Sequence, residues 1–234
     1  MKLKVKLFAD GASLKDIEKL NKNSFITGFT TNPTLMRKAG IKDYEFFCKE
    51  VLGIISDKPI SFEVFTDNLD EMYEQAIKIS SWGNNVYVKI PITNTKNETT
   101  FSIVKSLTEK QIKLNITAIM TDIQVQKILP ALENSPGAYL SIFAGRIADT
   151  GVDPLPILKN TIELLKDYKN TELIWASPRE VYNVIQANDI DCHIITATSD
   201  ILAKLDLFGK DLDEYSLETV KMFYNDALSA GYKI

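Results

Sequence analysis

Residues 84–91 read NNVYVKIP, an apolar run that contains one lysine and ends at a proline. Aliphatic residues alternate in it with Tyr87 and Lys89, which is the side-chain period of a β-strand whose two faces differ. A lysine is almost never fully buried unless its charge is paired or used. The run therefore predicts a buried strand, and we expect its lysine, Lys89, to act as a nucleophile.

Eight short apolar runs of this kind recur along the chain: KVKLFA, FITGFT, ISFEV, NVYVKIP, KLNITAI, AYLSIFA, ELIWAS and CHIITA. The segments between them show helical periodicity, as in residues 69–82. Strands that alternate with helices predict parallel βαβ units, and eight such units in about 200 residues predict a compact (β/α)8 barrel, or TIM barrel. A doubly wound open sheet is the alternative, although no Gly-x-Gly-x-x-Gly motif follows the first run.

The whole chain, residues 1–234, is predicted to form a single domain, because it contains neither a linker nor a low-complexity stretch. Its C-terminal part, from about residue 211 to 234, predicts one or two additional helices. A content of 45% hydrophobic and 25% charged residues is ordinary for a soluble globular protein. The net charge of -4 predicts no nucleic-acid partner, and no apolar run approaches the roughly 20 residues that span a membrane.

Cysteine and histidine are scarce, which limits the chemistry that the chain can perform. Cys48 and Cys192 lie far apart without a CxxC or CxxH motif, so neither a zinc site nor a disulfide framework is predicted. Because the N-terminal residues also lack the features of a signal peptide, we expect a reducing, cytoplasmic compartment. His193 is the single histidine and is interpreted as a strand-end residue, which disfavours a Ser-His-Asp triad or a multi-histidine metal centre.

Polar residues gather where the catalytic groups of a (β/α)8 barrel lie, at the C-terminal ends of the strands. Four consecutive predicted strands carry polar residues on one face and mainly aliphatic residues on the other. Because the helices of such a barrel pack outside it, we expect the polar face to line the lumen. The residues on this face or at the ends of the other strands are Asp10, Asn32, Ser61, Glu63, Lys89, Asn115, Thr117, Ser141, Phe143 and Ser177.

Each of these residues alone has a structural explanation; Asn32, for example, precedes Pro33 and fits a helix cap. Lys89, Glu63 and Asp10 are harder to explain together, because burying charges in a lumen is costly unless they are used. Imine chemistry suits this set of residue types. Burial favours the neutral, nucleophilic amine of a lysine, whereas a nearby carboxylate favours the ammonium and can accept its proton.

Two arginines follow the sixth and seventh predicted strands: Arg146 in FAGRI and Arg179 in ASPRE. Either arginine alone fits an exposed surface position. Two of them beside Ser177, at adjacent strand ends and with backbone N–H groups at a helix start, predict a phosphate clamp. We therefore expect a sugar-phosphate substrate.

The motifs GFTTNPTL, SFEV, VKIP, LNITAIMT, SIFAGRI and ASPRE, in this order, closely resemble those of the transaldolase family, class I aldolases with a (β/α)8 fold. The resemblance implies that Lys89 forms a Schiff base with a ketose donor and that Asp10 is the acid/base group when the C3–C4 bond breaks. Glu63 and Thr117 would hold a water during carbinolamine formation and dehydration. The implied substrate contacts are Asn32, Asn115, Ser141 and Phe143 for the dihydroxyacetone unit, and Arg146, Ser177 and Arg179 for the phosphate. No metal or organic cofactor is implied, because the imine is itself the electron sink.

By length the chain is similar to short transaldolases and to fructose-6-phosphate aldolases. Transaldolases carry Glu where Glu63 stands and the aldolases carry Gln; the aldolases also tend to have Tyr in place of Phe143 and lack the Gly145-Arg146 pair. The resemblance thus favours a transaldolase of the pentose phosphate pathway, which uses sedoheptulose 7-phosphate or fructose 6-phosphate as donor and glyceraldehyde 3-phosphate or erythrose 4-phosphate as acceptor. The alternatives are an aldolase-type lyase, a transaldolase dedicated to an unusual sugar, and a silent barrel that only binds sugar phosphates.

Two features depart from the family pattern: the insertion-like GVDPLPIL at residues 151–158, and Trp175 in IWASPRE. Both are expected close to the phosphate site. Short members of the family commonly assemble through their C-terminal helices, so the resemblance also implies a homo-oligomer, without indicating its size.

Overall fold

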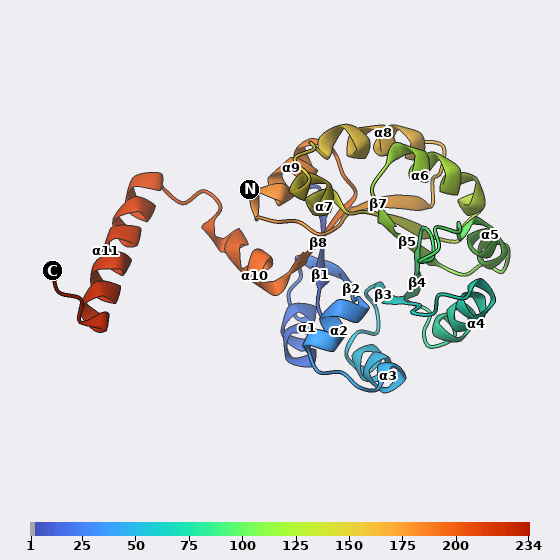
Figure 1. Cartoon of the computed structure of the whole chain (residues 1–234), viewed down its shortest axis with the longest axis horizontal. Helices are drawn as coiled ribbons and strands as arrows, with labels where there is room; N and C mark the ends of the chain where they lie inside the picture. The colour runs from blue at the N-terminus through green and yellow to red at the C-terminus, as the bar shows by residue number, and fades with distance from the viewer. Residues whose placement is uncertain (1–2) are drawn as a thin grey trace.

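A closed barrel of eight parallel strands forms the centre of the protein in the computed structural model, which describes residues 3–234 (Figure 1). The first two residues of the predicted domain lie outside the described residues. The strands are β1 (Lys6–Asp10), β2 (Ile26–Thr30), β3 (Ile60–Glu63), β4 (Val86–Pro91), β5 (Leu114–Ile119), β6 (Ala138–Ile142), β7 (Thr171–Trp175) and β8 (Ile194–Thr198). Each strand pairs with the next along the chain, and β8 closes the ring on β1. The (β/α)8 prediction is confirmed, and the open-sheet alternative is wrong.

Helices follow the strands and surround the barrel (Figure 1). They are α1 (Leu14–Asn21), α2 (Pro33–Lys38), α3 (Tyr44–Ile54), α4 (Leu69–Ser80), α5 (Phe101–Glu109), α6 (Asp122–Ile128), α7 (Ala144–Asp149), α8 (Leu155–Leu165), α9 (Tyr182–Asp189), α10 (Ser199–Leu202) and α11 (Leu212–Ala230), with 3-10 turns η1 (Leu129–Leu132) and η2 (Ala203–Leu207). Several begin at a side-chain cap, such as Ser13, which accepts a hydrogen bond from the Asp16 N–H at the start of α1.

The alternation of residues along the strands separates an outer core from the lumen. The aliphatic residues of β4 are buried in the large core that lies between the barrel and its helices. Tyr87 and Lys89, on the opposite face of β4, point into the lumen, where Tyr87 packs on a second, smaller apolar cluster and Lys89 lines a cavity. The expected division into an aliphatic outer face and a polar inner face is therefore present.

Aromatic rings fill the lower part of the lumen, towards the N-terminal ends of the strands. The rings of Tyr87 and Tyr139 stack with centroids 4.1 Å apart, and Phe8 meets Tyr139 edge to face at 5.7 Å. Gly28 makes room for Phe8, because a Cβ atom at position 28 would lie 2.4 Å from that ring. These aromatic residues therefore pack the lower part of the barrel, opposite the C-terminal ends of the strands.

The C-terminal helix α11 stands apart from the barrel in Figure 1, at the end of a segment that leaves α10. None of its residues is buried, although many are large and apolar. Its exposed apolar residues are Leu212, Tyr215, Leu217, Val220, Met222, Phe223, Tyr224 and Leu228. Across the described range, 3–234, every helix is too short or too polar to cross a membrane.

Candidate active site

A cavity of about 630 Å³ opens at the C-terminal ends of the strands, which is where the active sites of (β/α)8 barrels lie. Its size is typical of a site for a small molecule. Ten of the eleven residues that the sequence assigned to the site line this cavity. They are Asp10, Asn32, Glu63, Lys89, Thr117, Ser141, Phe143, Arg146, Ser177 and Arg179.

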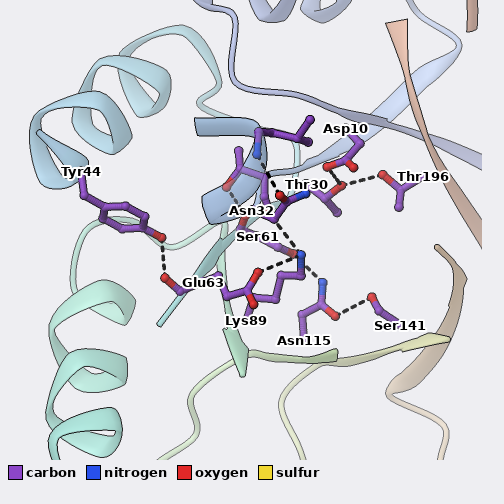
Figure 2. Close-up of polar contacts among 12 residues, drawn as sticks. Asp10, Thr30, Asn32, Tyr44, Ser61, Glu63, Lys89, Asn115, Ser141 and Thr196 are labelled. Atoms are coloured by element: carbon purple, nitrogen blue, oxygen red, sulfur yellow. Dashed lines mark hydrogen bonds and ion pairs between the residues drawn. The ribbon is translucent and has the colours of Figure 1, made fainter. Parts of the chain in front are cut away.

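Lys89 lies on β4 at the floor of the cavity and is only 5% exposed. Its Nζ donates a hydrogen bond to the backbone carbonyl of Thr31 at 3.0 Å and lies 3.1 Å from Oε2 of Glu63 on β3 (Figure 2). Register places the two side chains together, because Glu63 and Lys89 are direct partners in the β3–β4 ladder. A carboxylate at this distance can take the proton that an ammonium must lose before its nitrogen attacks a carbonyl.

Glu63 is held in place through its main chain. The hydroxyl of Tyr44, on α3, donates a hydrogen bond to the carbonyl oxygen of Glu63 at 2.6 Å, and Figure 2 shows this contact on the side of β3 away from Lys89. Burial raises the pKa of Tyr44 above its ordinary value, so the phenol stays protonated and remains a donor. The contact fixes the end of β3 and with it the carboxylate that faces Lys89.

Asp10 ends β1 and enters the cavity from the side opposite β5 in the ring of strands. Its Oδ1 accepts a hydrogen bond from the hydroxyl of Thr30, its ladder partner on β2, at 2.8 Å. Burial raises the pKa of the Asp10 carboxyl above its ordinary value, and the charge of Glu63 acts in the same direction; Lys89 and the Thr30 hydrogen bond oppose them. A carboxyl whose pKa is raised holds a proton more readily than an ordinary aspartate, which suits a group that accepts a proton and returns it.

Thr117 lies on β5 where that strand is irregular. Ala118 has a φ of +61°, and the register of the β5–β6 ladder shifts between Ile116 and Ile119. The hydroxyl of Thr117 is buried and has no hydrogen-bond partner within residues 3–234. Because an unpartnered buried hydroxyl is costly, and this one lines the cavity, it is ready to bind a water or a substrate oxygen.

Asn115 is the one predicted site residue that does not line the cavity. Its Nδ2 donates to the Ser61 hydroxyl at 2.9 Å, and its Oδ1 accepts from the Ser141 hydroxyl at 2.8 Å (Figure 2). Both ends of its amide are therefore engaged by protein groups, and its side chain is fully buried beneath the cavity lining. In this structure Asn115 positions Ser141, which does line the cavity, and its predicted contact with substrate remains a prediction.

The two arginines that are predicted to bind phosphate both line the cavity. Arg146 lies on α7, with its guanidinium carbon 5.6 Å from the centre of the Phe143 ring, and Arg179 follows β7. Arg179 binds both carboxylate oxygens of Asp149, and Nε meets Oδ1 at 3.0 Å. This hydrogen bonding, with the charges of both arginines, holds the pKa of Asp149 below its ordinary value. Arg179 is thus held in one orientation at the edge of the cavity.

Close packing brings together the segments that carry the two arginines. A Cβ atom on Gly145 would lie 1.7 Å from the carbonyl oxygen of Ser177, so only glycine lets α7 approach the loop after β7. Ser177 itself has a φ of +60°, a conformation that costs energy for a residue with a side chain. Strain of this kind is concentrated at functional sites.

The structure places three further features that the sequence singled out. Asn32 is indeed a helix cap, since its Oδ1 accepts from the Leu35 N–H at the start of α2, yet it also lines the cavity. Trp175 does not lie at the phosphate site: its side chain belongs to the outer core, because Ile174 and Ala176 take the lumen-facing positions of β7. The GVDPLPIL segment is the connection from α7 into the first turn of α8.

Comparison with known proteins gives the same assignment. The sequence model of the transaldolase/fructose-6-phosphate aldolase family matches residues 7–233. The chain belongs to this family. It is 35% identical to probable transaldolase 2 of Listeria monocytogenes over 202 residues, which cover 86% of this chain and 88% of the relative. It is 32% identical to the probable transaldolase of a Thermoanaerobacter species over 231 residues, which cover 98% of this chain and all of the relative.

Membership in the transaldolase/aldolase family makes the protein an enzyme with a transaldolase-type function. Some polar groups at its candidate active site were not singled out from the sequence: Thr30, Tyr44, Asp149 and Thr196. Thr30 and Thr196 could have been found by extending the lumen-face alternation to the second and eighth strands. Tyr44 and Asp149 lie on helices and carry no sequence signal. Within residues 3–234, no three His, Cys, Asp or Glu side chains are grouped so that they could hold a metal ion.

Proposed function

We propose that this protein is a transaldolase that transfers a dihydroxyacetone unit from sedoheptulose 7-phosphate or fructose 6-phosphate to glyceraldehyde 3-phosphate or erythrose 4-phosphate, in the pentose phosphate pathway. The observation that carries the proposal is the buried Lys89, 3.1 Å from the Glu63 carboxylate, on the floor of a cavity that also holds Asp10 and two arginines. A buried amine beside a proton acceptor suits attack on a ketone.

The reaction begins when Lys89 loses a proton to Glu63 and its Nζ attacks C2 of the ketose. The resulting carbinolamine loses its C2 hydroxyl as water and becomes an imine. Glu63 and the unpartnered hydroxyl of Thr117 hold the water involved, and Glu63 supplies the proton with which the hydroxyl leaves. The protonated imine then withdraws electrons from the C3–C4 bond.

Cleavage follows at Asp10. Its carboxylate takes the proton of the C4 hydroxyl, the C3–C4 bond breaks, and the bonding electrons move into the imine to form an enamine on Lys89. The shortened aldose phosphate leaves. In the second half, C3 of the enamine attacks the aldehyde carbon of the acceptor, and Asp10 returns its proton to the new C4 oxygen. Hydrolysis of the imine releases the product ketose.

Arg146 and Arg179 bind the phosphate of the donor and then of the acceptor, with the hydroxyl and N–H of Ser177. Asn32 and Ser141 hydrogen-bond the hydroxyls of the three-carbon unit, and Phe143 narrows the cavity beside Arg146. The cavity of about 630 Å³ can accept a sugar phosphate of six or seven carbons.

The nearest alternative is a lyase that releases free dihydroxyacetone, as a fructose-6-phosphate aldolase does. Glu63 favours the transferase, because the resemblance implies a glutamate at this position in transaldolases and a glutamine in the aldolases. If this assignment is right, Glu63→Gln raises the release of free dihydroxyacetone relative to transfer. No rise in that ratio, measured by enzymatic assay of dihydroxyacetone, counts against the role given to Glu63.

The deciding experiment measures release of glyceraldehyde 3-phosphate from fructose 6-phosphate, with and without erythrose 4-phosphate. Continuous release only with the acceptor, and no more than one equivalent per site without it, establishes a transaldolase. Equal release in both tubes makes the protein an aldolase. No release in either, with no fixation of added free dihydroxyacetone to Lys89 by borohydride, leaves the silent barrel; fixation of free dihydroxyacetone without release from fructose 6-phosphate directs the search to other phosphorylated ketoses.

We also propose that the enzyme works as a homo-oligomer in the cytoplasm. The apolar residues of α11 are exposed and would be covered by a second copy of the chain. The two cysteines are free and buried, in agreement with a reducing compartment. Sedimentation of the full chain and of a chain that ends at residue 210 tests the assembly: we expect the shortened chain to be smaller by more than the mass removed.

A further inference from the structure

We propose that Thr30 and Thr196 form a hydroxyl relay that orients Asp10, so that Oδ1 is always engaged by the protein and Oδ2 alone exchanges the proton with substrate. Both threonines are positioning residues in this proposal. It rests on the acid/base role of Asp10 in the proposed function and goes beyond it by naming the reacting oxygen and the groups that select it.

The relay crosses three adjacent strands of the barrel. The Oγ1 of Thr30 on β2 lies 2.8 Å from Oδ1 of Asp10 on β1 and 2.6 Å from Oγ1 of Thr196 on β8, as Figure 2 shows. Thr30 is 3% exposed and Thr196 is 4% exposed, yet both line the cavity. Hydrogen bonds of this length between side chains that are almost completely buried from water keep those side chains in a fixed geometry.

The direction of the protons follows from counting donors. A threonine hydroxyl has one hydrogen to donate, and an ionised carboxylate can only accept. Thr30 therefore gives its hydrogen to Asp10, so the hydrogen in the contact between the two threonines must come from Thr196. Thr196 thus keeps Thr30 turned towards Asp10 as a donor. Within residues 3–234, Oδ2 of Asp10 has no hydrogen-bond partner.

The arrangement persists through the catalytic cycle. When Asp10 accepts a proton from substrate, that proton resides on Oδ2, and Oδ1 goes on accepting from Thr30. The proton is therefore always returned from the same atom, facing the same side of the cavity. Without the relay, the carboxyl could rotate and place either oxygen, protonated or not, towards the substrate.

Other charges face Asp10 and set the background for any pH effect. Lys89 on β4 favours the carboxylate, and Glu63 on β3 disfavours it. The remaining charged groups that line the cavity are Lys38 on α2, Arg146 on α7, Arg179 after β7 and Asp200 on α10. These charged groups are the same in the wild type and in the threonine variants. A shift in the pH dependence of cleavage when a threonine hydroxyl is removed is therefore attributed to loss of the relay.

The test compares Thr30→Val and Thr196→Val, which keep the shape of the side chain and remove the hydroxyl, with Thr30→Ser and Thr196→Ser, which keep it. Thr161→Val is the control, since its buried hydroxyl also donates one hydrogen bond, to Ile157 in α8, away from Asp10. Two quantities are followed against pH: cleavage of fructose 6-phosphate in the presence of erythrose 4-phosphate, and fixation of added free dihydroxyacetone to Lys89 by borohydride in the absence of sugar phosphate, read by mass spectrometry.

We expect Thr30→Val to lower kcat by about tenfold to a hundredfold, because a hydrogen bond to a charged group is lost. The carboxylate loses a donor and its pKa rises, so the acid limb of kcat/KM for cleavage moves to higher pH by about one pH unit or more. Thr196→Val shifts the limb in the same direction by less. The serine variants and Thr161→Val keep the wild-type profile, and the pH dependence of fixation at Lys89 does not move in any variant.

A wild-type pH profile of cleavage in Thr196→Val overturns the relay. A shift of the pH profile of fixation together with that of cleavage also overturns it, because Lys89 would then be the group affected. Should Thr30→Val fail to fold by circular dichroism, Thr196→Val and Thr196→Ser decide alone. Failure of the proposed function looks different, because wild-type protein would then show either no cleavage or equal cleavage with and without erythrose 4-phosphate.

Discussion

The lumen of this barrel consists of two layers that come from the same strands but have opposite characters. The lower layer is mainly apolar and the upper layer is mainly polar, and on four of the strands a lower and an upper residue are two positions apart. The pairs, lower residue first, are Phe8 and Asp10 on β1, Tyr87 and Lys89 on β4, Tyr139 and Ser141 on β6, and Ile194 and Thr196 on β8. Two residues are one repeat of the strand, so the side chains of a pair share a face at different heights.

This comparison shows how the fold accommodates a costly set of buried charges. The stacked Tyr87 and Tyr139 rings and Phe8 provide packing energy in the lower part of the barrel. The upper layer provides chemistry: Lys89, Glu63 and Asp10 lie partly or largely out of water in a cavity open at one end. We therefore expect changes in the lower layer to affect stability with little effect on imine formation, and changes in the upper layer to do the reverse.

The largest effect is expected at Lys89. Lys89→Met removes the nucleophile and keeps the length of an apolar stem, so transfer should fall by about four orders of magnitude or more. The barrel should remain folded, because the lower layer is intact, although Glu63 loses its ion-pair partner. Coupled assay of glyceraldehyde 3-phosphate measures the activity and circular dichroism measures the fold. Residual transfer above a tenth of wild type is incompatible with an imine on Lys89.

Tyr139→Ala removes an aromatic ring from the lower layer. Removal of a buried aromatic ring should reduce the free energy of unfolding by about 3–5 kcal/mol, measured by urea denaturation. Below the denaturation midpoint, borohydride should still fix dihydroxyacetone to Lys89. Tyr139→Phe, which keeps the stack with Tyr87, serves as the control and should lose much less stability. Equal losses in the two variants would mean that the ring stack does not support the barrel.

Asp10 makes the contrast between function and stability explicit. Burial raises its pKa in the folded protein, so the folded state disfavours the carboxylate, and this unfavourable contribution at neutral pH disappears as the pH falls through the folded pKa. Asp10→Asn should therefore raise the melting temperature at pH 7, with a smaller rise in acid, while transfer falls by about 10²–10⁴-fold.

Asp200 provides a control of opposite sign for Asp10→Asn. The Thr198 hydroxyl beside it holds the pKa of Asp200 below its ordinary value, so its carboxylate contributes stability that is lost only in acid. Asp200→Asn should lower the melting temperature at pH 7. Scanning calorimetry at several pH values separates the two cases; a fall in melting temperature for Asp10→Asn at pH 7 would contradict the cost assigned to its burial.

The smallest effects compare two hydroxyls that are buried without a partner among the described residues, Thr117 in the upper layer and Thr108 on α5. Thr108→Val and Thr117→Val should each leave stability unchanged or raise it by about 1 kcal/mol, because an unsatisfied group is removed. Only Thr117→Val should slow transfer, by about tenfold. Equal activity in the two variants, measured in the coupled assay, would remove Thr117 from the mechanism.

Much of this organisation could be read from the sequence, because it depends on local periodicity. The alternation in VYVKIP and LNITAI predicted both the strands and the face that lines the lumen, and ten of the eleven predicted site residues do line the cavity. The side-chain partners could not be read in this way. The Asn115 amide is hydrogen-bonded at both ends, to Ser61 and to Ser141, and Arg179 binds Asp149. These contacts depend on packing between segments that are distant in the sequence, so periodicity cannot predict them.

Trp175 shows a further limit of periodicity. In ELIWA both faces of the strand are apolar, so the pattern cannot tell which face is inner. In the structure Ile174 lies inside, in the apolar cluster of the lumen, and Trp175 lies in the outer core. A small lumen accepts the isoleucine side chain more easily than the larger indole.

The position of α11 has a consequence for how the chain is made. Synthesis proceeds from the N-terminus, so the apolar helix leaves the ribosome after β8 has become available to close the barrel on β1. The exposed apolar surface of α11 thus appears when all eight strands of the barrel are available to pair with one another. A circular permutant that places α11 first would expose the same surface to unpaired strands, and we expect it to aggregate during expression at a temperature at which the natural order yields folded protein.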